Sequence, residues 1–326
     1  MININNILRC FPNSAVRKID EYILSNNINI NYLEEIRVRV NRPIILKLGQ
    51  VEKIIEYNVT IDEILEMLQQ ICDNSIYSFQ NQICNGFITI KGGHRVGIAG
   101  NVVIKDGKVI NISYISSLNF RIAKQILGAS DKVIKYIINN EVNNIYSTLL
   151  VSPPGVGKTT VLRDLIRRLS NGINQIDFKG INIGVVDERG EIGAMYRGIP
   201  QNDLGIRTDI LDGIPKSIGM TMLIRSMAPK VIVADEIGSK DDIEAIKYAM
   251  CCGIKGIFTA HGESIENLKL NPSLNNLIEN HFFEKIIFLS DKFEKCGVDK
   301  IYSLNKEEKY YSLITKEESN RYAKSS

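Results

Sequence analysis

An apolar strand, a glycine-containing loop and a helix follow one another at residues 146–169, and this unit limits the fold more than any other part of the chain. The loop at 152–160 reads Ser-Pro-Pro-Gly-Val-Gly-Lys-Thr-Thr. A loop of this composition between a strand and a helix is the arrangement that a phosphate-binding P-loop requires. Lysine and threonine rarely follow two spaced glycines by chance, so a glycine turn without a ligand is the weaker interpretation.

Each polar position of this loop has a role in phosphate chemistry. Gly155 and Gly157 let the backbone turn its N–H groups toward phosphate oxygens, and Lys158 brings a positive charge to the β- and γ-phosphates. Thr159 offers a hydroxyl to Mg²⁺. The first glycine of the formal motif is Ser152 here, and we expect a small residue to allow the turn. The predicted phosphate-binding residues are Pro154, Gly155, Val156, Gly157, Lys158, Thr159 and Thr160.

Three further apolar strands end in polar residues. One is followed by Asp235 and Glu236, and we expect Asp235 to hold Mg²⁺ through water and Glu236 to polarise the attacking water. A second is followed by Asp187 and Glu188, which would shape the metal shell or the water site; a salt-bridged strand end is the alternative. His261 ends the third strand, where it would sense the γ-phosphate, although a lone histidine is more often an ordinary surface or core residue.

The arrangement of strands and helices divides the chain into two parts. From residue 146 onward short apolar strands alternate with helical stretches, which predicts an α/β domain with a mostly parallel sheet. The preceding part contains alternating strands, helix-like stretches and glycine-rich hairpins, which indicates a smaller mixed α+β domain. The expected boundaries are 1–123 for the N-terminal mixed domain, 124–145 for a helical connection, 146–305 for the P-loop domain and 306–326 for a polar C-terminal tail.

Composition and charge exclude several classes of protein. With 44% hydrophobic and 24% charged residues the chain has an ordinary globular composition, so it is neither a disordered chain nor a fibre. No apolar stretch approaches the roughly 20 residues of a membrane-spanning helix, and the N-terminus lacks a signal-peptide pattern. The net charge of +3 is too small to argue for nucleic acid or a membrane as a partner.

Arginines are a further group of candidates, because phosphoryl transfer often uses an arginine at the γ-phosphate that a neighbouring subunit supplies. The candidates are Arg95, Arg121, Arg197, Arg207 and Arg225. For each of them taken singly, a solvated or salt-bridged side chain is the more common role. The glycine- and arginine-rich segment 196–209 lacks periodicity and is typical of a loop at a subunit interface.

Several longer runs of the sequence resemble the stage III sporulation protein AA family, ATPases of endospore-forming bacteria that are similar to the motors of type II and type IV secretion and of pili. The most specific run, Val-Val-Asp-Glu-Arg-Gly-Glu-Ile at 185–192, carries far more information than a P-loop alone. The matching runs are 185–192, 196–209 and 223–229, with 35–49 and 92–100 in the N-terminal part and 146–262 in the C-terminal part.

This resemblance implies a C-terminal RecA-like P-loop ATPase domain, a smaller N-terminal domain, and ATP and Mg²⁺ as ligands. It also implies a homo-hexamer in the mother-cell cytoplasm, peripheral to the membrane beneath the channel of the stage III sporulation AA–AH membrane proteins. The residues it assigns are Lys158, Thr159 and Thr160 to Walker A, Asp235 and Glu236 to Walker B, Asp187 and Glu188 to the aspartate box, His261 to the histidine box, and Arg225 to the arginine before Walker B. Where secretion ATPases carry Glu-Ile-Arg-Asp, this chain has Glu-Ile-Gly-Ser at 236–239.

Three functions fit these observations to different degrees. The favoured one is an ATP-hydrolysing motor or gate that powers or assembles a secretion-like channel between mother cell and forespore. Its catalytic candidates are Glu236, Asp187, Glu188, His261, Arg225, Arg121 and Arg95. The alternative is a nucleotide-regulated P-loop protein that binds single-stranded nucleic acid, but the weak charge and the few aromatic residues beside basic clusters argue against it. A scaffold that binds nucleotide without turnover is the third, and Glu236 argues against it because a scaffold needs no carboxylate that activates water.

Overall fold

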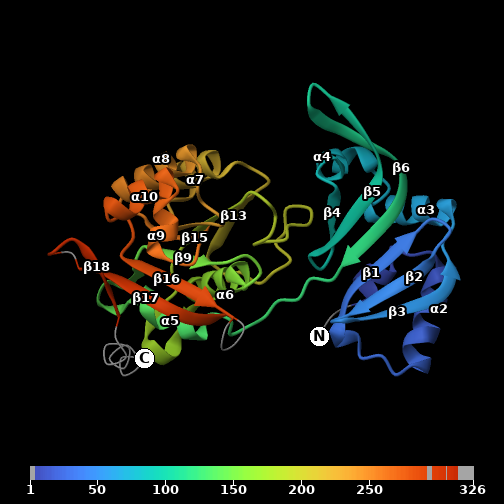
Figure 1. Cartoon of the computed structure of the whole chain (residues 1–326), viewed down its shortest axis with the longest axis horizontal. Coiled ribbons are helices and arrows are strands. Elements are labelled where there is room, and N and C mark those ends of the chain that lie inside the picture. Colours follow the sequence, from blue (N-terminus) through green and yellow to red (C-terminus); the bar gives the residue numbers. More distant parts are fainter. Residues whose placement is uncertain (1–3, 292–295, 306, 315–326) are drawn as a thin grey trace. The chain divides into compact units, whose positions relative to one another are not determined.

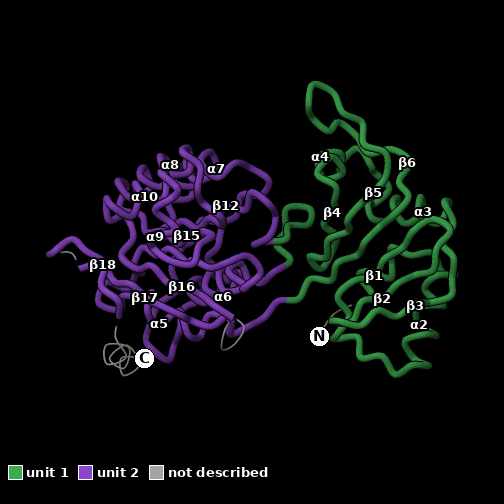
Figure 2. The backbone as a smooth tube through the Cα atoms, in the orientation of Figure 1, with its two compact units in different colours: residues 1–124, 194–201 green, residues 125–193, 202–326 purple. Residues whose placement is uncertain are grey.

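The computed structural model describes residues 4–291, 296–305 and 307–314, and its chain forms two compact units. Unit 1 contains residues 1–124 and the separate segment 194–201, and unit 2 contains residues 125–193 and 202–326 (Figure 2). The backbone therefore passes between the units three times, after residues 124, 193 and 201. Each unit has its own main sheet; unit 1 has one hydrophobic core, and unit 2 has one on each face of its sheet.

Strands and helices alternate along unit 2 (Figure 1). Its helices are α5 (Asp131–Ile137), α6 (Lys158–Asn171), α7 (Lys216–Met227), α8 (Lys240–Cys251), α9 (Ile265–Lys269) and α10 (Pro272–Glu279). The strands of its large sheet are β9 (Thr148–Ser152), β12 (Ile183–Asp187), β13 (Thr208–Asp212), β14 (Val231–Ala234), β15 (Lys255–His261), β16 (Lys285–Ser290), β17 (Gly297–Asn305) and β18 (Tyr310–Leu313). Two small ribbons join β7 (Ile138–Asn139) to β8 (Asn144–Ile145) and β10 (Gly172–Ile173) to β11 (Phe178–Lys179). In the described part of the chain, no helix is both long and apolar enough to cross a membrane.

The eight strands of the large sheet lie in the order β13-β12-β14-β15-β9-β16-β17-β18. The first six are parallel, and β17 and β18 are antiparallel additions at one edge. Because parallel strands end at the same edge, the loops after β9, β12, β14 and β15 share the carboxyl edge of the sheet. This arrangement confirms the predicted α/β fold with a mostly parallel sheet. Strand β18 lies within the predicted tail 306–326, of which residues 306 and 315–326 are outside the described residues.

Helices cover both faces of this sheet, because successive side chains of a strand point to opposite faces. In β9, Leu150 packs in one core with α5 and α6, whereas Leu149 and Val151 pack in the other with α7, α8 and α10. All residues of β9 and β12 are buried, which explains why these strands read as nearly continuous apolar runs. The strand that leads into the P-loop is therefore fixed by packing on both faces.

Unit 1 is the smaller mixed α+β unit that the sequence predicts. Its helices are α1 (Asn5–Leu8), α2 (Asn13–Ser25), α3 (Ile61–Ile71) and α4 (Gln80–Cys84). Its strands are β1 (Leu33–Arg39), β2 (Pro43–Leu48), β3 (Val51–Asn58), β4 (Phe87–Ile90), β5 (His94–Lys105) and β6 (Lys108–Arg121). They form an antiparallel sheet in the order β3-β2-β1-β6-β5-β4, whose β5–β6 hairpin extends beyond the other strands (Figure 1).

One face of this sheet carries the core of unit 1. Ile36 and Val38 of β1 are fully buried and pack with residues of α2 and α3, whereas Arg37 between them points to the other face. Helix α3 begins at a capping box, in which Thr60 Oγ1 accepts the N–H of Glu63 at 3.2 Å and the Glu63 carboxylate accepts the N–H of Thr60 at 2.9 Å. The alternating apolar residues of β1 and the capping residues of α3 thus match the strand and the helix that the chain forms.

The stretch 124–145, which the sequence predicts as a helical connection, contains the α-helix Asp131–Ile137 and a short 3-10 helix at Asn140–Val142. The asparagine-rich run that follows forms the β7–β8 ribbon, and Asn143 in its turn is left-handed with φ +43°. Asparagine side chains bond to nearby backbone groups and therefore favour such turns over helix. The Asn139 side chain does this here by accepting the N–H of Glu141 at 3.2 Å.

Acid should destabilise unit 1 through His94, which is 3% exposed and whose Nδ1 accepts the N–H of Ala123 at 3.1 Å. Burial lowers the pKa of His94 from 6.5 to about 4. The unfolded chain therefore binds a proton between pH 6.5 and 4 that the folded unit does not, so stability is present above pH 6.5 and is lost as the pH falls. The loss reaches about 3 kcal/mol. Hydrogen exchange of β1 and β6 amides at pH 7 and 4.5 measures it, and an equal pH dependence in His94→Gln would contradict it.

Candidate nucleotide-binding site

The P-loop has the backbone that phosphate binding requires. Gly155 and Gly157 have φ of +81° and +107°, a region that favours glycine. Ser152, at the position of the first motif glycine, is the last residue of β9, where the extended backbone suits any side chain. Helix α6 begins at Lys158, so its first N–H groups and the positive end of its dipole face the loop. Serine in place of glycine therefore leaves this turn intact.

The side chain of Lys158 is buried at this edge. Its ammonium donates to the carbonyl oxygen of Ser152 at 3.1 Å and to the hydroxyl of Ser152 at 3.3 Å, and its Nζ lies 3.0 Å from Nδ1 of His261. Burial lowers the pKa of Lys158, and the negative charges of Asp235 and Glu236 oppose that effect. The structure thus positions a cation directly behind the glycine turn.

A row of hydrogen bonds joins Lys158 to Glu236. An ammonium group only donates, so Nδ1 of His261 accepts from Lys158, and a neutral imidazole then carries its proton on Nε2. That Nε2 lies 3.0 Å from Oε1 of Glu236, and Nη1 of Arg189 donates to Oε2 of the same carboxylate. The backbone of Glu236 is left-handed with φ +52°, a conformation that non-glycine residues adopt mainly where the surroundings hold them. Two donors therefore fix the orientation of the Glu236 carboxylate.

Thr159 and Asp235 together form an oxygen pair suited to Mg²⁺. The hydroxyl of Thr159 donates to Oδ2 of Asp235 at 2.7 Å, and the hydroxyl of Thr259 donates to Oδ1. Mg²⁺ in nucleotide sites takes one or two protein oxygens, with phosphates and waters completing the shell. Among the described residues, no group of three or more histidine, cysteine, aspartate or glutamate side chains is placed to hold a metal ion. The donor set therefore fits Mg²⁺ bound together with a nucleotide.

Asp187 and Glu188 have different contacts, which indicate different roles. Asp187 is 2% exposed, and its carboxylate accepts the N–H groups of Glu191, Ile192 and Gly193 at 2.8, 2.9 and 2.7 Å. A carboxylate that receives three backbone N–H groups fixes a turn. Glu188 is partly exposed and forms an ion pair with Lys216. The sequence left a salt-bridged strand end as the alternative interpretation of these two acids. In this structure Glu188 is salt-bridged in that way.

Comparison with known proteins identifies the family. The family model described as "Sporulation stage III, protein AA" matches residues 3–309. The chain belongs to this family. It is 38% identical to "Stage III sporulation protein AA" of Bacillus subtilis over 299 residues, which are 91% of this chain and 94% of that protein. The resemblance read from the sequence is therefore confirmed.

Solved structures of a pilus retraction motor and of an ATPase share the fold. The pilus retraction motor PilT with bound ADP matches with a TM-score of 0.55 and 14% identity, over 94% of this chain and 88% of that one. The ATPase DotB of Legionella pneumophila matches with a TM-score of 0.53 and 13% identity, over 95% of this chain and 84% of that one. At such low identity the likeness concerns the fold alone, and it supports the predicted RecA-like architecture of the P-loop unit.

The candidate arginines are distributed over both units. Arg95 and Arg121 in unit 1 are direct cross-strand neighbours in β5 and β6, so their side chains emerge on one face of the sheet, and the Arg95 guanidinium lies 4.6 Å from the centre of the Phe87 ring. In unit 2, Arg207 donates to the carbonyl oxygen of Ser170 at 2.9 Å, which is a structural contact.

The remaining two arginines also have defined surroundings. Arg225 is exposed on α7, where it lines a cavity of about 630 Å³ with residues of α8 such as Asp241 and Glu244. Arg197 belongs to unit 1, where it pairs with Asp73 at 2.8 Å. The salt-bridged role that is more common for a single arginine therefore describes Arg197 in this structure.

Three residues at this edge were not predicted. Thr259 is fully buried in β15, and its hydroxyl accepts the N–H of Glu236 at 2.8 Å as well as donating to Asp235. Arg189 holds Glu236, and its place directly after two acids is the only signal of this in the sequence. The thiol of Cys296 lies 3.4 Å from the carbonyl oxygen of Val156 in the P-loop, and no local pattern announces this long-range contact.

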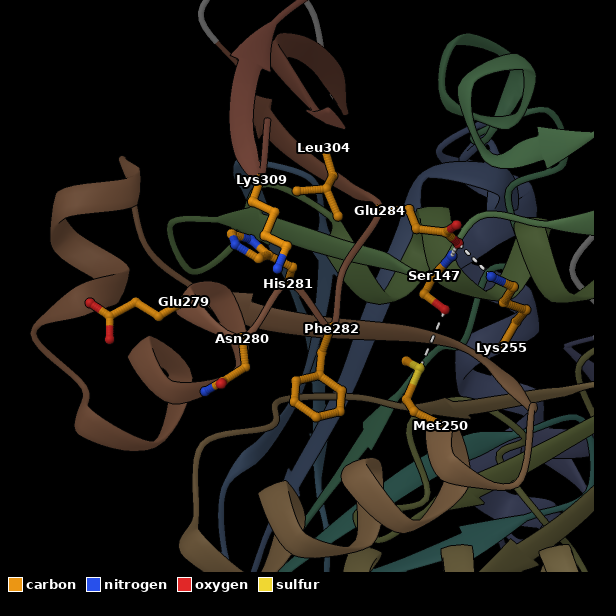
Figure 3. A pocket seen from close by; sticks show the side chains of 10 residues that line it. All are labelled: Ser147, Met250, Lys255, Glu279, Asn280, His281, Phe282, Glu284, Leu304 and Lys309. Atoms are coloured by element: carbon orange, nitrogen blue, oxygen red, sulfur yellow. Dashed lines mark hydrogen bonds and ion pairs between the residues drawn. The ribbon is translucent and has the colours of Figure 1, made fainter. Parts of the chain in front are cut away.

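Figure 3 shows another cavity of unit 2. It has a volume of about 690 Å³ and is lined by residues that precede or begin parallel strands, such as Ser147 before β9 and Lys255 at the start of β15. In its wall Glu284 pairs with Lys255 at 2.7 Å and accepts the N–H of Ser147 at 2.9 Å. Because the P-loop lies at the opposite, carboxyl ends of the strands, this cavity is not the nucleotide site.

Proposed function

We propose that this protein hydrolyses ATP in the presence of Mg²⁺. The observation that carries the proposal is the row Lys158, His261, Glu236 and Arg189, which lies beside the P-loop at the carboxyl edge of the sheet. In the proposed reaction the N–H groups of the P-loop and Lys158 hold the phosphates, and Glu236 orients the attacking water. Mg²⁺, held by Thr159 and Asp235, would neutralise charge that develops on the phosphate oxygens.

His261 connects the phosphate side of the proposed site to the water side. It contacts both Lys158 and Glu236, so a change at the γ-phosphate that moves Lys158 is expected to reach Glu236 through the imidazole ring. Glu188 is a second carboxylate on the same edge, and we infer that Asp187 acts by fixing the turn that follows it. Arg95, Arg121 and Arg225 remain the arginines proposed to reach a nucleotide.

We further propose that the chain acts as a homo-hexameric motor or gate for a channel between mother cell and forespore during sporulation. Membership of the sporulation stage III protein AA family supports the sporulation role, and the fold shared with a pilus retraction motor supports the motor. In this proposal the protein works in the mother-cell cytoplasm. It binds the membrane proteins of the stage III AA–AH channel.

ATP hydrolysis measured against protein concentration tests the proposal, with and without EDTA and with and without single-stranded DNA or RNA. If neighbouring subunits complete the site, the specific activity should rise steeply with protein concentration. If hydrolysis needs Mg²⁺, EDTA should abolish it. We expect no response to nucleic acid. No hydrolysis at any concentration would overturn the ATPase proposal, and stimulation by nucleic acid would favour the nucleic-acid-binding alternative. The same chain with ADP in place of ATP provides the background rate.

A further inference from the structure

A strap of eight residues, 194–201, leaves unit 2 after Gly193 and returns to it at Asn202, yet packs as part of unit 1. The sequence pattern of 196–209 favours a loop at a subunit interface, whereas the first part of this segment is bound within its own chain. The strap closes in a tight turn, in which Tyr196 and Ile199 exchange two backbone hydrogen bonds of 3.0 Å. It is therefore a defined structure with two ends in unit 2.

Several bonds anchor the strap within unit 1. The hydroxyl of Tyr196 donates to Oδ2 of Asp73 at 2.6 Å, and Nη2 of Arg197 lies 2.8 Å from the same oxygen. The N–H of Gly92 donates to the side-chain oxygen of Gln201 at 2.8 Å. Burial, and next the bond to Asp73, raise the pKa of the Tyr196 phenol, so this hydroxyl stays protonated and keeps donating at neutral pH.

The residues that flank the strap on either side lie in unit 2 and are hydrogen-bonded to each other. The side-chain amide of Asn202 donates to the carbonyl oxygen of Ile192 at 2.8 Å, and both Asn202 and Asp187 are buried. Asp187 in turn holds the N–H groups of Ile192 and Gly193. The strap thus continues directly into the turn at 188–193, and that turn carries Arg189, which holds Glu236.

We propose that Asp73 and Tyr196 are positioning residues for the reaction, although both lie in unit 1. Their bonds hold the strap, the strap holds the turn at 188–193, and the turn sets where Arg189 holds the Glu236 carboxylate. The link between strap and turn is covalent, because residue 194 directly follows residue 193. Loss of the anchor leaves the phosphate-binding residues untouched but loosens the group that orients the water. This inference rests on the proposed ATPase function.

The test compares the double variant Asp73→Asn/Tyr196→Phe with the wild-type full-length chain. Both substitutions keep shape; asparagine tolerates the left-handed backbone of residue 73, where φ is +48°. Tyr77→Phe is the matched control, because Tyr77 lies near Asp73 in the sequence but is 91% exposed. Three quantities are measured: hydrogen exchange of amides 191–193, the Kd for a fluorescent ATP analogue, and kcat.

We expect amides 191–193 to exchange about fivefold faster in the double variant. We expect kcat to fall about tenfold with the Kd unchanged, and Tyr77→Phe to behave as wild type. Unchanged exchange at 191–193 would overturn the anchoring role, and faster exchange with unchanged kcat would overturn the positioning role. A wild-type chain that hydrolyses no ATP would refute the proposed function instead, and the exchange measurement would still decide whether the strap holds the turn.

Discussion

Glu236→Gln is expected to bind ATP as tightly as the wild-type chain and to hydrolyse it about a thousandfold more slowly. Glutamine has the shape of glutamate, and its one side-chain oxygen can still accept the hydrogen bond from Arg189, while its amide nitrogen replaces the oxygen that faces His261. The phosphate-binding residues keep their positions. It lacks the negative charge that draws a proton from the attacking water, so the chemical step loses its base. Single-turnover hydrolysis and the Kd for a fluorescent ATP analogue, measured on the same preparation, separate the two effects.

Glu266→Gln on α9 is the matched control for this substitution, because Glu266 is an exposed glutamate of the same unit and should leave both values unchanged. Turnover retained in Glu236→Gln would move the role of base to another carboxylate. Glu188 would then be the first residue to test, because the oxygens of Asp187 already accept three backbone N–H groups. A joint loss of binding and turnover would instead mean that the Glu236 charge supports the fold of the site.

Lys158→Ala should abolish nucleotide binding at working concentrations, raising the Kd for ATP about a hundredfold. The ammonium is the only cation that the P-loop sequence itself supplies, and charge-assisted bonds to phosphate contribute about 1.5–3 kcal/mol. The substitution also frees His261, which loses its donor at Nδ1 and with it the preference for holding a proton on Nε2. Titration calorimetry with ATP in the presence of Mg²⁺ measures the loss of affinity.

Lys240→Ala is a matched control, since Lys240 is also the first residue of a helix in unit 2 but is exposed on α8. We expect it to bind ATP like the wild-type chain. An unchanged affinity in Lys158→Ala would overturn the P-loop assignment, because Lys158 is the cation that this assignment brings to the phosphates. Circular dichroism of both variants establishes that the large sheet of unit 2 is intact.

Much of the architecture could be predicted because it depends on local pattern. The P-loop can be recognised in the sequence because Gly155 and Gly157 must adopt positive φ and Lys158 must begin a helix. Buried parallel strands such as β9 and β12 read as apolar runs that end in polar residues. Since all parallel strands end at one edge, the order of motifs along the chain also predicted that Asp235 and His261 face the same edge as the P-loop.

Other features depend on contacts between distant parts of the chain, and no local signal announces them. Asp187 and Asp235 both follow an apolar strand, and their local sequences do not predict their different contacts. The Asp187 carboxylate accepts N–H groups of the turn that follows it, whereas Asp235 accepts the hydroxyl of Thr159, which lies much earlier in the sequence. The anchoring of the strap needs Asp73, more than a hundred residues before it. By itself the sequence determined the P-loop, the strand ends and the fold class, because neighbouring residues set backbone conformation and burial. Only the tertiary structure decided which side chain holds which, because those bonds form only once distant segments have packed.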